Sequence, residues 1–379
     1  MAGAAHRHGA IRPSHISIFT SMDNLHFPSA HDGFDTRLLE TYLASRLPGF
    51  EGKLEVSRFK GGQSNPTYRL DTPSRAYVMR TKPAPAAKLL PSAHAIEREF
   101  RVMQALHGTD VPVPEVHLLC EDESIIGRAF YIMELVQGRI FWDQSLPELT
   151  RSARVSVYDE MNRVIAALHK LKPADIGLDD FGKPGNYFER QIARWTKQYR
   201  ASATKPAEPI EAMDRLIDWL PQNIPPTARD ESRTALVHGD FRLDNLVFNQ
   251  EGTRAIGVLD WELSTLGHPL ADLSYHCLGW HVKAGPFEGI AGLDHATLGI
   301  PDERQYIMRY CIRTGRLGEL DAILADWNFY LAYNLFRLAG ILQGIAQRAS
   351  LGIASNEKAK ATGAYARPFA ELAWELASG

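Results

Sequence analysis

The sequence predicts an α+β fold of two lobes, and three features of the chain support this prediction. Strand-like segments separated by turns fill the chain up to residue 136, whereas helical periodicity dominates from residue 149 onward. The 379 residues, 45% of them hydrophobic, are enough to give both lobes a buried core. We expect a flexible N-terminal arm over residues 1–34, an N-lobe over 35–136 and a C-lobe over 137–379.

The N-lobe segments predict a five-stranded antiparallel sheet with a helix. Apolar residues recur at helical spacing over 92–106, and a second helix is expected over 35–47. Gly, Pro and Asp turns separate five segments rich in apolar and aromatic residues. The strands expected from these segments cover residues 54–59, 68–70, 76–80, 115–120 and 129–136.

The C-lobe is expected to be mostly helical. Tyr158, Met161 and Ile165 begin one apolar stripe at helical spacing, and a second stripe runs over 188–199. The apolar stretch 323–342 is interrupted by Asp, Asn and Arg, so it predicts a buried helix and not a membrane span. Three short strands are expected over 235–240, 246–248 and 255–259.

Composition excludes several classes of function. The net charge of −3 provides no basic field for nucleic acid. The three cysteines lie far apart without a CxxC pair, so we expect neither disulfides nor a cysteine zinc site. The first residues lack the apolar core of a signal peptide, and we expect a soluble, cytoplasmic protein with no membrane contact. The sequence carries no signal for an oligomeric state.

The residues that indicate chemistry run from His238 to Asp260. A strand leads into a loop that carries Asp240, Asn245 precedes the next strand, and Asp260 ends a third. These strand ends can bring two carboxylates and an amide oxygen together, which are oxygen ligands that suit Mg²⁺. A lone His-Gly-Asp tripeptide is compatible with an ordinary turn. The ordered set predicts a site for a metal ion and a nucleotide.

The string His-Gly-Asp-x4-Asn at 238–245, followed by Asp-Trp-Glu at 260–262, resembles the aminoglycoside phosphotransferase and choline kinase superfamily. The resemblance is strongest to the phosphotransferase subgroup related to the kinase domain fused to acyl-CoA dehydrogenases. It extends from about residue 50 to 345 and includes the strings at 60–68, 93–100, 111–114, 131–134 and 261–267. It implies a protein-kinase-like two-lobe fold that uses ATP and Mg²⁺ to phosphorylate a hydroxyl group of a small molecule.

The resemblance also implies roles for individual residues. Asp240 is similar to the catalytic base, and Asn245 and Asp260 are similar to the Mg²⁺ ligands. The nucleotide-binding residues implied are the loop over the triphosphate (Gly61, Gly62, Gln63, Ser64, Asn65), the phosphate-binding cation Arg80, its partner Glu99, and the first hinge residues Met133 and Glu134. Asp272 resembles the helix residue that braces the catalytic loop.

The strand cation departs from the superfamily pattern, which usually has a lysine. The third strand ends in Arg80, and Lys82 follows two residues later. Arginine keeps the charge and can bind phosphate through two donors, so activity is compatible with Arg80. Lys82 remains an alternative for this role.

Three further polar residues are expected to have roles other than catalysis. Asp244 is an alternative base, but pairing with Arg242 is the expected role. Glu262 is an alternative contact to a second metal through water, but a solvated or capping carboxylate is the expected role. His169 is expected to be a buried, hydrogen-bonded histidine and not a ligand.

Three other functions are less consistent with the sequence. A regulatory protein kinase needs an activation segment ending in Ala-Pro-Glu, and the interval between Asp260 and Asp272 is too short to hold one. A binuclear metallophosphoesterase needs several histidine ligands, which do not follow Asn245 in a suitable setting. A nucleotide-binding pseudokinase is favoured only by Arg80.

The acceptor is expected to be a hydroxylated small molecule. The resemblance suggests a hydroxy acid or a hydroxyacyl-CoA, with an aminoglycoside or another amino alcohol as the alternative. The segment 187–223, where the superfamily places its substrate-recognition helices, carries an excess of basic residues and so favours an anionic acceptor.

Overall fold

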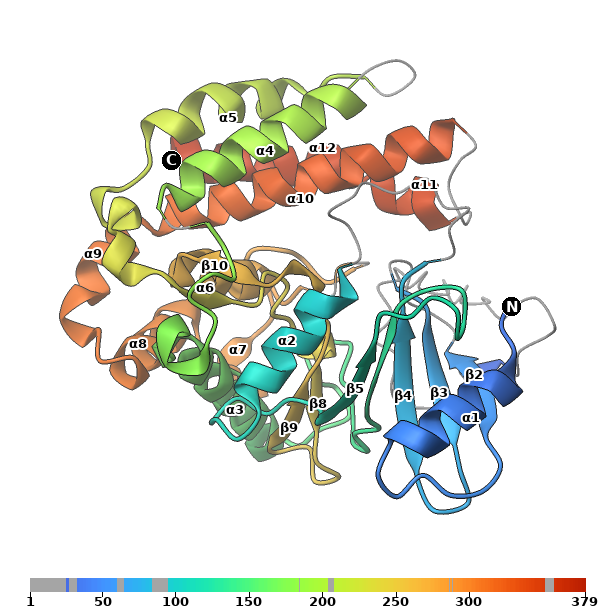
Figure 1. Cartoon of the computed structure of the whole chain (residues 1–379). Coiled ribbons are helices and arrows are strands. Elements are labelled where there is room, and N and C mark those ends of the chain that lie inside the picture. The colour runs from blue at the N-terminus through green and yellow to red at the C-terminus, as the bar shows by residue number, and fades with distance from the viewer. Residues whose placement is uncertain are drawn as a thin grey trace, which may run out of the picture.

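The computed structural model describes residues 25–26, 33–59, 65–83, 95–183, 185–203, 208–285, 287, 289–351 and 358–379. These residues form two lobes, a twisted sheet with its helices and a larger helical part (Figure 1). The predicted α+β fold is confirmed.

The N-lobe is an antiparallel sheet in the order β1-β2-β3-β4-β6-β5. Its strands are β1 (Leu25–His26), β2 (Glu55–Phe59), β3 (Thr67–Asp71), β4 (Ala76–Thr81), β5 (Val116–Cys120) and β6 (Phe130–Glu134). The five predicted strands are present. The two-residue β1 adds a sixth strand from the segment expected to be an arm, and it pairs with Arg58 and Phe59.

Both faces of the sheet are covered, because successive side chains of a strand point to opposite sides. Tyr77 and Met79 of β4 lie in the apolar cluster under helix α1 (Thr36–Arg46). Val78 lies in the larger core beside helix α2 (Ile96–Leu106), which sits between the sheet and the C-lobe (Figure 1). Arg80, two residues beyond Val78, therefore points toward the C-lobe.

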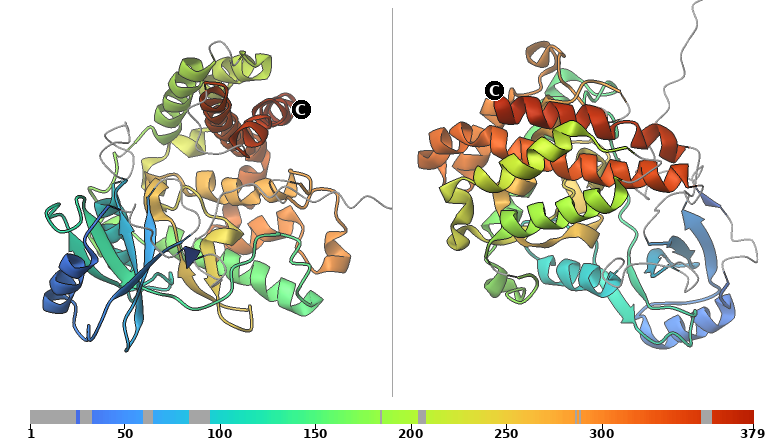
Figure 2. Two further views of the ribbon diagram at one scale, coloured as in Figure 1. Left: turned by 90° about the vertical axis from the view of Figure 1, so that its right-hand side faces the viewer. Right: turned by 90° about the horizontal axis from the view of Figure 1, so that it is seen from above.

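The C-lobe is built from ten α-helices among the described residues. They are α3 (Arg151–Lys170), α4 (Tyr187–Ser202), α5 (Glu211–Gln222), α6 (Pro269–Cys277), α7 (His295–Leu298), α8 (Glu303–Arg313), α9 (Leu320–Ala325), α10 (Trp327–Ser350), α11 (Lys358–Gly363) and α12 (Ala366–Ser378). Helices α4, α5, α10 and α12 pack together on one side of the catalytic segment (Figure 2). Asp326 separates α9 from α10, so the stretch predicted as one buried helix is two.

Two short strand pairs hold the central segment of the C-lobe. β7 (Ala235–Val237) pairs with β10 (Thr265–Gly267), and β8 (Leu246–Phe248) pairs with β9 (Ala255–Val258). The chain passes from β6 to this region at Gly138, where an added Cβ would lie 2.2 Å from the carbonyl oxygen of Phe248. The next residue, Arg139, exchanges backbone hydrogen bonds of 2.7 and 2.8 Å with Phe248. A glycine is therefore required where the two lobes join.

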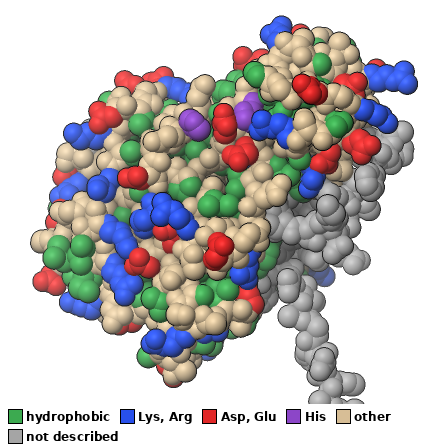
Figure 3. Space-filling model, turned by 90° about the horizontal axis from the view of Figure 1, so that it is seen from below, with side chains coloured by type: hydrophobic (Ala, Val, Ile, Leu, Met, Phe, Trp, Pro, Cys, Tyr) green, Lys and Arg blue, Asp and Glu red, His purple; other side chains and the backbone are tan. Residues whose placement is uncertain are grey.

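The distribution of charged side chains and the state of the cysteines can be compared with the composition. Acidic and basic side chains are interspersed over the face shown in Figure 3. Cys120, Cys277 and Cys311 are all buried and free. Within the described ranges, no helix combines the length and the apolar character that crossing a membrane requires.

Candidate active site

The loop after β7 is held by the buried carboxylate of Asp272 on α6. Asp272 accepts hydrogen bonds from the backbone N–H groups of His238, at 2.7 Å, and Gly239, at 2.9 Å. Its Oδ2 also lies 3.2 Å from Nε2 of His169. Burial by itself raises the pKa of Asp272, but His169 and His238 together outweigh burial and the pKa is lowered. The predicted bracing role of Asp272 and the buried, hydrogen-bonded state of His169 are confirmed.

Asp240 is a half-buried carboxylate with two side-chain donors. The hydroxyl of Tyr275 donates to its Oδ1 at 2.6 Å, and Nδ2 of Asn245 lies 3.3 Å from its Oδ2. Burial alone raises the pKa of Asp240, but the cation of Arg242 and the Tyr275 hydroxyl outweigh burial, so the pKa lies below its ordinary value. Asp240 is therefore ionised at neutral pH and can accept a hydrogen bond from a hydroxyl group.

Asn245 and Asp260 lie at the two ends of the β8–β9 hairpin. The hairpin pairs Leu246 with Val258, and the backbone N–H of Leu259 donates to the carbonyl of Asn245 at 2.9 Å. Nδ2 of Asn245 donates to the backbone carbonyl of Asp240 at 2.8 Å. Among the described residues no donor hydrogen-bonds to Oδ1 of Asn245, so this oxygen can act as a ligand. The hairpin thus brings Asn245 beside Leu259, the residue before Asp260, and the convergence of the three side chains on one metal ion stays a prediction.

Asp260 has a left-handed backbone, with φ of 66°. This conformation is costly for a residue with a side chain and is often found at functional sites. The carbonyl of the preceding Leu259 lies 2.9 Å from Nε2 of His238. The turn thus directs the Asp260 carboxylate, whose side chain is 35% exposed, toward the N-lobe.

Arg80 joins the two lobes. Its Nη2 lies 2.9 Å from Oδ1 of Asp260 and 3.4 Å from Oε2 of Glu262, and its Nε lies 3.1 Å from Oε2 of Glu99. Burial by itself lowers the pKa of Arg80, but Glu99 and Asp260 outweigh it and raise the pKa well above its ordinary value. The predicted pair of Arg80 and Glu99 is therefore present.

Glu99 is almost fully buried and is held from two sides. Nδ2 of Asn65 donates to its Oε1 at 2.7 Å, and the hydroxyl of Tyr131 donates to its Oε2 at 3.1 Å. Burial raises the pKa of Glu99, an effect that Arg80 opposes. Asn65, expected in the triphosphate loop, thus anchors the end of that loop to α2. The other expected loop residues, Gly61, Gly62, Gln63 and Ser64, lie outside the described residues.

The alternative cation Lys82 has a different partner. Its ammonium group pairs with Glu97, on the first turn of α2, and its side chain is 37% exposed. Arg80, with a side chain 7% exposed, is the cation directed at Asp260. The geometry therefore favours Arg80 as the group that faces the predicted metal ligand.

The expected hinge residues end β6. Met133 is buried in register with Val78 of β4, and Glu134 is exposed. The backbone N–H of Glu134 donates to the carbonyl of Glu115 at 2.8 Å. The segment that follows contacts the C-lobe, since Val136 packs against the β9 residue Gly257.

Two carboxylates near the site can now be assigned partners. Asp244 accepts from Nε of Arg242 at 3.0 Å and also pairs with its Nη2, so the predicted pairing is confirmed. Glu262 was expected to be solvated or capping, and this was wrong. It pairs with Arg80, because the short 3₁₀ turn Trp261–Leu263 brings it beneath the sheet.

Comparison with known proteins identifies the family. Residues 55–306 match the model of the phosphotransferase enzyme family. The chain belongs to this family. Family membership makes it a phosphotransferase.

Named relatives support the assignment. The chain is 47% identical over 343 residues to acyl-CoA dehydrogenase family member 10 of Mus musculus. The matched region covers 90% of this chain and 31% of the mouse protein. It spans less than half the length of the curated relatives it matches.

Two solved structures support the fold. A crystal structure from Ralstonia eutropha, assigned by name to the aminoglycoside phosphotransferases, is 57% identical and covers 91% of this chain and 98% of its own, with a TM-score of 0.81. Choline kinase of Cryptosporidium parvum shares the fold at 13% identity, with a TM-score of 0.59 over 89% of this chain and 96% of its own.

Sequence reasoning missed Tyr275, whose hydroxyl donates to Asp240. One signal was available: Tyr275 follows Asp272 by three positions on α6, and residues at this spacing share a helix face. Since Asp272 was expected to brace the catalytic loop, the same face placed Tyr275 against that loop. Tyr131 and Asn65 carried no comparable signal for their contact with Glu99.

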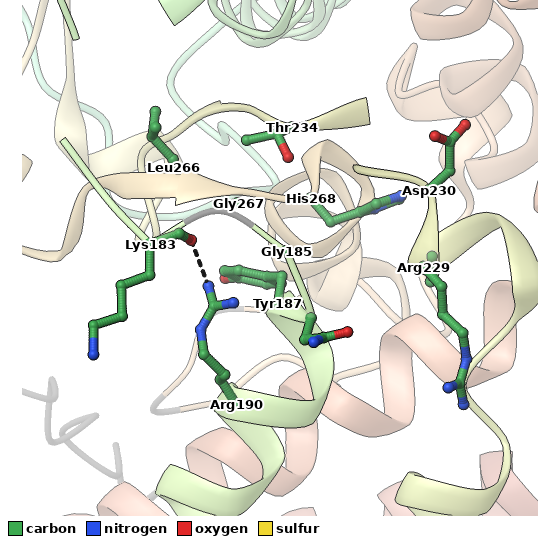
Figure 4. Close-up of a pocket in the computed structure, with 12 residues that line it drawn as sticks. Lys183, Gly185, Tyr187, Arg190, Arg229, Asp230, Thr234, Leu266, Gly267 and His268 are labelled. Atoms are coloured by element: carbon green, nitrogen blue, oxygen red, sulfur yellow. Dashed lines mark hydrogen bonds between the residues drawn. The ribbon is translucent and has the colours of Figure 1, made fainter. Parts of the chain in front are cut away.

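A small surface pocket lies apart from these residues (Figure 4). Thr234, Gly267 and His268 line it, at the end of β7 opposite to Asp240. Arg190 crosses the pocket and donates to the carbonyl of Lys183 at 2.7 Å. None of the predicted site residues lines this pocket, so it is distinct from the candidate active site.

Proposed function

We propose that the chain transfers the γ-phosphate of ATP, with Mg²⁺, to the hydroxyl group of a hydroxy acid or a hydroxyacyl-CoA. The observation that carries the proposal is the arrangement around Asp240. Its carboxylate is held ionised beside Asn245, while Arg80 of the other lobe reaches Asp260.

Asp240 is the proposed catalytic base. It orients the acceptor hydroxyl and takes its proton while the hydroxyl oxygen bonds to the γ-phosphorus and the bond to the bridging oxygen of ADP breaks. Its lowered pKa makes it a weak base. Proton transfer therefore comes late, and orientation of the hydroxyl is the larger contribution.

Asn245 and Asp260 are the proposed Mg²⁺ ligands. One carboxylate and one amide oxygen fit an ion that keeps most of its coordination for water and phosphate. Oδ1 of Asn245 accepts no hydrogen bond from the described residues, which supports this role. When bound, Mg²⁺ neutralises negative charge on the phosphates.

Arg80 is the proposed phosphate-binding cation. Glu99 pairs with its Nε side as a charge, without a hydrogen bond to Nε, and Nη2 can bind phosphate oxygens in place of its contact with Asp260. We further propose that residues 61–65 cover the triphosphate and that Met133 and Glu134 begin the adenine-binding hinge.

The proposed acceptor class rests on two considerations. The curated relatives are named for acyl-CoA dehydrogenases, whose substrates carry an acyl group. Helix α4 also has an excess of basic side chains, among them Arg194 and Lys197. An aminoglycoside or another amino alcohol is the second candidate, favoured by the name of the 57% identical Ralstonia structure.

Measured phosphate transfer tests the proposal. ADP release from ATP and MgCl₂ is followed with hydroxy acids, hydroxyacyl-CoAs, aminoglycosides and choline, and phosphorylated products are verified by mass spectrometry. Asp240→Asn serves as the inactive control. Transfer only to amino alcohols selects the second candidate, whereas no transfer above the control with any acceptor indicates a pseudokinase. We also propose a cytoplasmic location, in keeping with the free buried cysteines.

A further inference from the structure

Two arginines are buried among the described residues, and their surroundings differ. Arg80, 6% exposed, has three carboxylates within 3.4 Å. Arg337, 8% exposed, has no carboxylate at ion-pair distance in the described part of the chain. Buried charges in proteins are normally paired. The guanidinium of Arg337 is therefore a cation with capacity for an oxygen ligand.

Arg337 lies directly beside the proposed base. It extends from α10 and donates from Nη2 to the carbonyl of Gly239, at 2.6 Å. Its guanidinium carbon lies 5.0 Å from the ring centroid of Tyr275. The hydroxyl of that same ring donates to Asp240, so the cation lies over the tyrosine whose hydroxyl holds the base.

Trp195 supplies a second donor next to this cation. The guanidinium carbon of Arg337 lies 5.6 Å from the indole ring centroid, so Arg337 has contacts with aromatic rings of both α4 and α6. Nε1 of Trp195 is buried without a hydrogen-bond partner in the described residues. A buried N–H group without a partner is costly, which suggests that a ligand or water supplies the acceptor.

We propose that Arg337 and Trp195 form a binding site for an acyl oxygen of the acceptor, either a carboxylate or a thioester carbonyl, beside Asp240. This inference rests on the proposed function and names the acceptor feature that the active site selects. A guanidinium has five donors in a planar fork, and Arg337 uses one of them on Gly239. The remaining donors fit acyl oxygens, whereas the cationic groups of aminoglycosides and choline meet a like charge.

A purely structural role for Arg337 explains less. In a structural role Arg337 braces the carbonyl of Gly239 with one donor, and its charge contributes to the lowered pKa of Asp240. This role does not account for the unpartnered indole N–H of Trp195. The two donors are explained together by one acceptor atom between α4, α6 and α10.

Equilibrium binding tests the inference without requiring catalysis. The full chain, with MgCl₂ and a non-hydrolysable ATP analogue, is titrated in a calorimeter with 2-, 3- and 4-hydroxybutyrate, with their CoA thioesters, and with the matching butanediols. The wild-type chain is expected to bind at least one acyl compound about tenfold to a hundredfold more tightly than its diol, as for a hydrogen bond to a charged group. Preference for free acids identifies the carboxylate as the ligand, and preference for thioesters alone identifies the carbonyl.

Single substitutions test which residues cause the preference for acyl compounds over diols. Arg337→Met should abolish it, Arg337→Lys should restore part of it, and Trp195→Phe should reduce it while keeping the ring. Arg194→Met is the matched control, because the exposed Arg194 lies over the same indole ring at 5.2 Å. If Arg337→Met does not fold, as judged by thermal unfolding, the other two variants decide.

Three results would overturn the inference: equal binding of acyl compounds and diols by the wild-type chain, a preference that survives Arg337→Met and Trp195→Phe, or an equal loss in Arg194→Met. These results are separable from a failure of the proposed function. A chain that prefers acyl compounds but transfers no phosphate contradicts the proposed function alone. A chain that phosphorylates a hydroxy acid or a hydroxyacyl-CoA but binds acyl compounds and diols equally contradicts this inference alone.

Discussion

The hydroxyl of Tyr275 donates a hydrogen bond to Oδ1 of Asp240 across 2.6 Å, from a helix that also carries the brace of the catalytic loop. Burial raises the pKa of Tyr275, so its hydroxyl remains a donor over the working pH range. The pKa of Asp240 is lowered in turn, after burial is outweighed by Arg242 and Tyr275. The base is thus kept ionised by its neighbours and not by exposure to water.

The first prediction concerns the pH dependence of turnover. The ionised form of Asp240 is the active one, so activity is lost as the pH falls through its lowered pKa. Tyr275→Phe removes a contact that lowers this pKa, and the acid limb of kcat/KM should therefore begin at a higher pH than in the wild-type chain. We expect kcat to fall about tenfold or more, since the carboxylate loses an orienting donor. The measurement is a pH–rate profile of both chains.

Tyr310→Phe is the matched control for this experiment. It removes another buried tyrosine hydroxyl, which lies 2.9 Å from Nδ1 of His169 and does not contact Asp240. This variant should lose stability but keep the acid limb of the wild-type chain. Equal displacement of the acid limb in both variants would mean that the Tyr275 hydroxyl does not set the pKa of Asp240.

The second prediction separates the base from the metal ligand. Asp240→Ala should leave the affinity for Mg²⁺-ATP nearly intact and remove most turnover, about a hundredfold or more. Asp260→Ala should weaken the binding of Mg²⁺-ATP itself, because it removes a charged ligand. Nucleotide titrations with and without MgCl₂, together with kcat, test this division. Equal loss of nucleotide binding in the two variants contradicts it.

The third prediction compares the two candidate phosphate cations. Arg80→Met leaves the buried Glu99 without its cation, and unfolding should become easier by about 3–5 kcal/mol. The same change should weaken nucleotide binding, and Arg80→Lys should recover only part of it because the two-donor geometry is lost. Lys82→Met, which removes a half-exposed ion pair with Glu97, should change stability by only about 0.5 kcal/mol. A larger loss of nucleotide affinity in Lys82→Met than in Arg80→Met would reverse the assignment.

The sequence predicted those parts of the site that depend on local order. Asn245 and Asp260 could be placed together because they flank a hairpin, and a hairpin brings its ends together whatever the rest of the fold does. The role of Arg80 was expected from the family resemblance, and the alternation of β4 explains why Arg80 shares the face of Val78. The three-residue β10 was not predicted, since so short a pairing leaves no periodic pattern.

Contacts between elements that are far apart in the sequence could not be predicted from local sequence patterns. Glu262 was expected in solvent, and only the packing of the sheet against the turn after Asp260 brings it to Arg80. Trp195 belonged to a group of aromatic residues expected to pack the C-lobe, some of them as candidates for lining the acceptor pocket, and Arg337 was recognised only as a polar interruption of the stretch 323–342. Their shared position beside Asp240 depends on how α4, α6 and α10 pack together, which no single helical stripe encodes.

The fourth prediction concerns His276, a buried histidine on α6 that packs against Phe241 of the catalytic loop. Its Nε2 lies 2.8 Å from the hydroxyl of Tyr306, and burial lowers its pKa from 6.5 to about 4. Between these two pH values the unfolded chain binds a proton that the folded chain does not, so stability falls as the pH drops from 6.5 toward 4. At pH 5 this group should cost about 2 kcal/mol relative to pH 7.5.

His276→Gln removes the titrating group while keeping a polar side chain near Tyr306. The variant should be less stable than the wild-type chain at pH 7.5, because the packing against Phe241 changes, but it should lose less stability between pH 7.5 and pH 5. Urea unfolding at several pH values measures the difference, and carboxylates contribute equally to both chains. His107→Gln, at an exposed histidine after α2, is the control and should retain the wild-type pH dependence. If the stability of His276→Gln falls as steeply as that of the wild-type chain over this interval, the histidine is not held neutral in the folded protein.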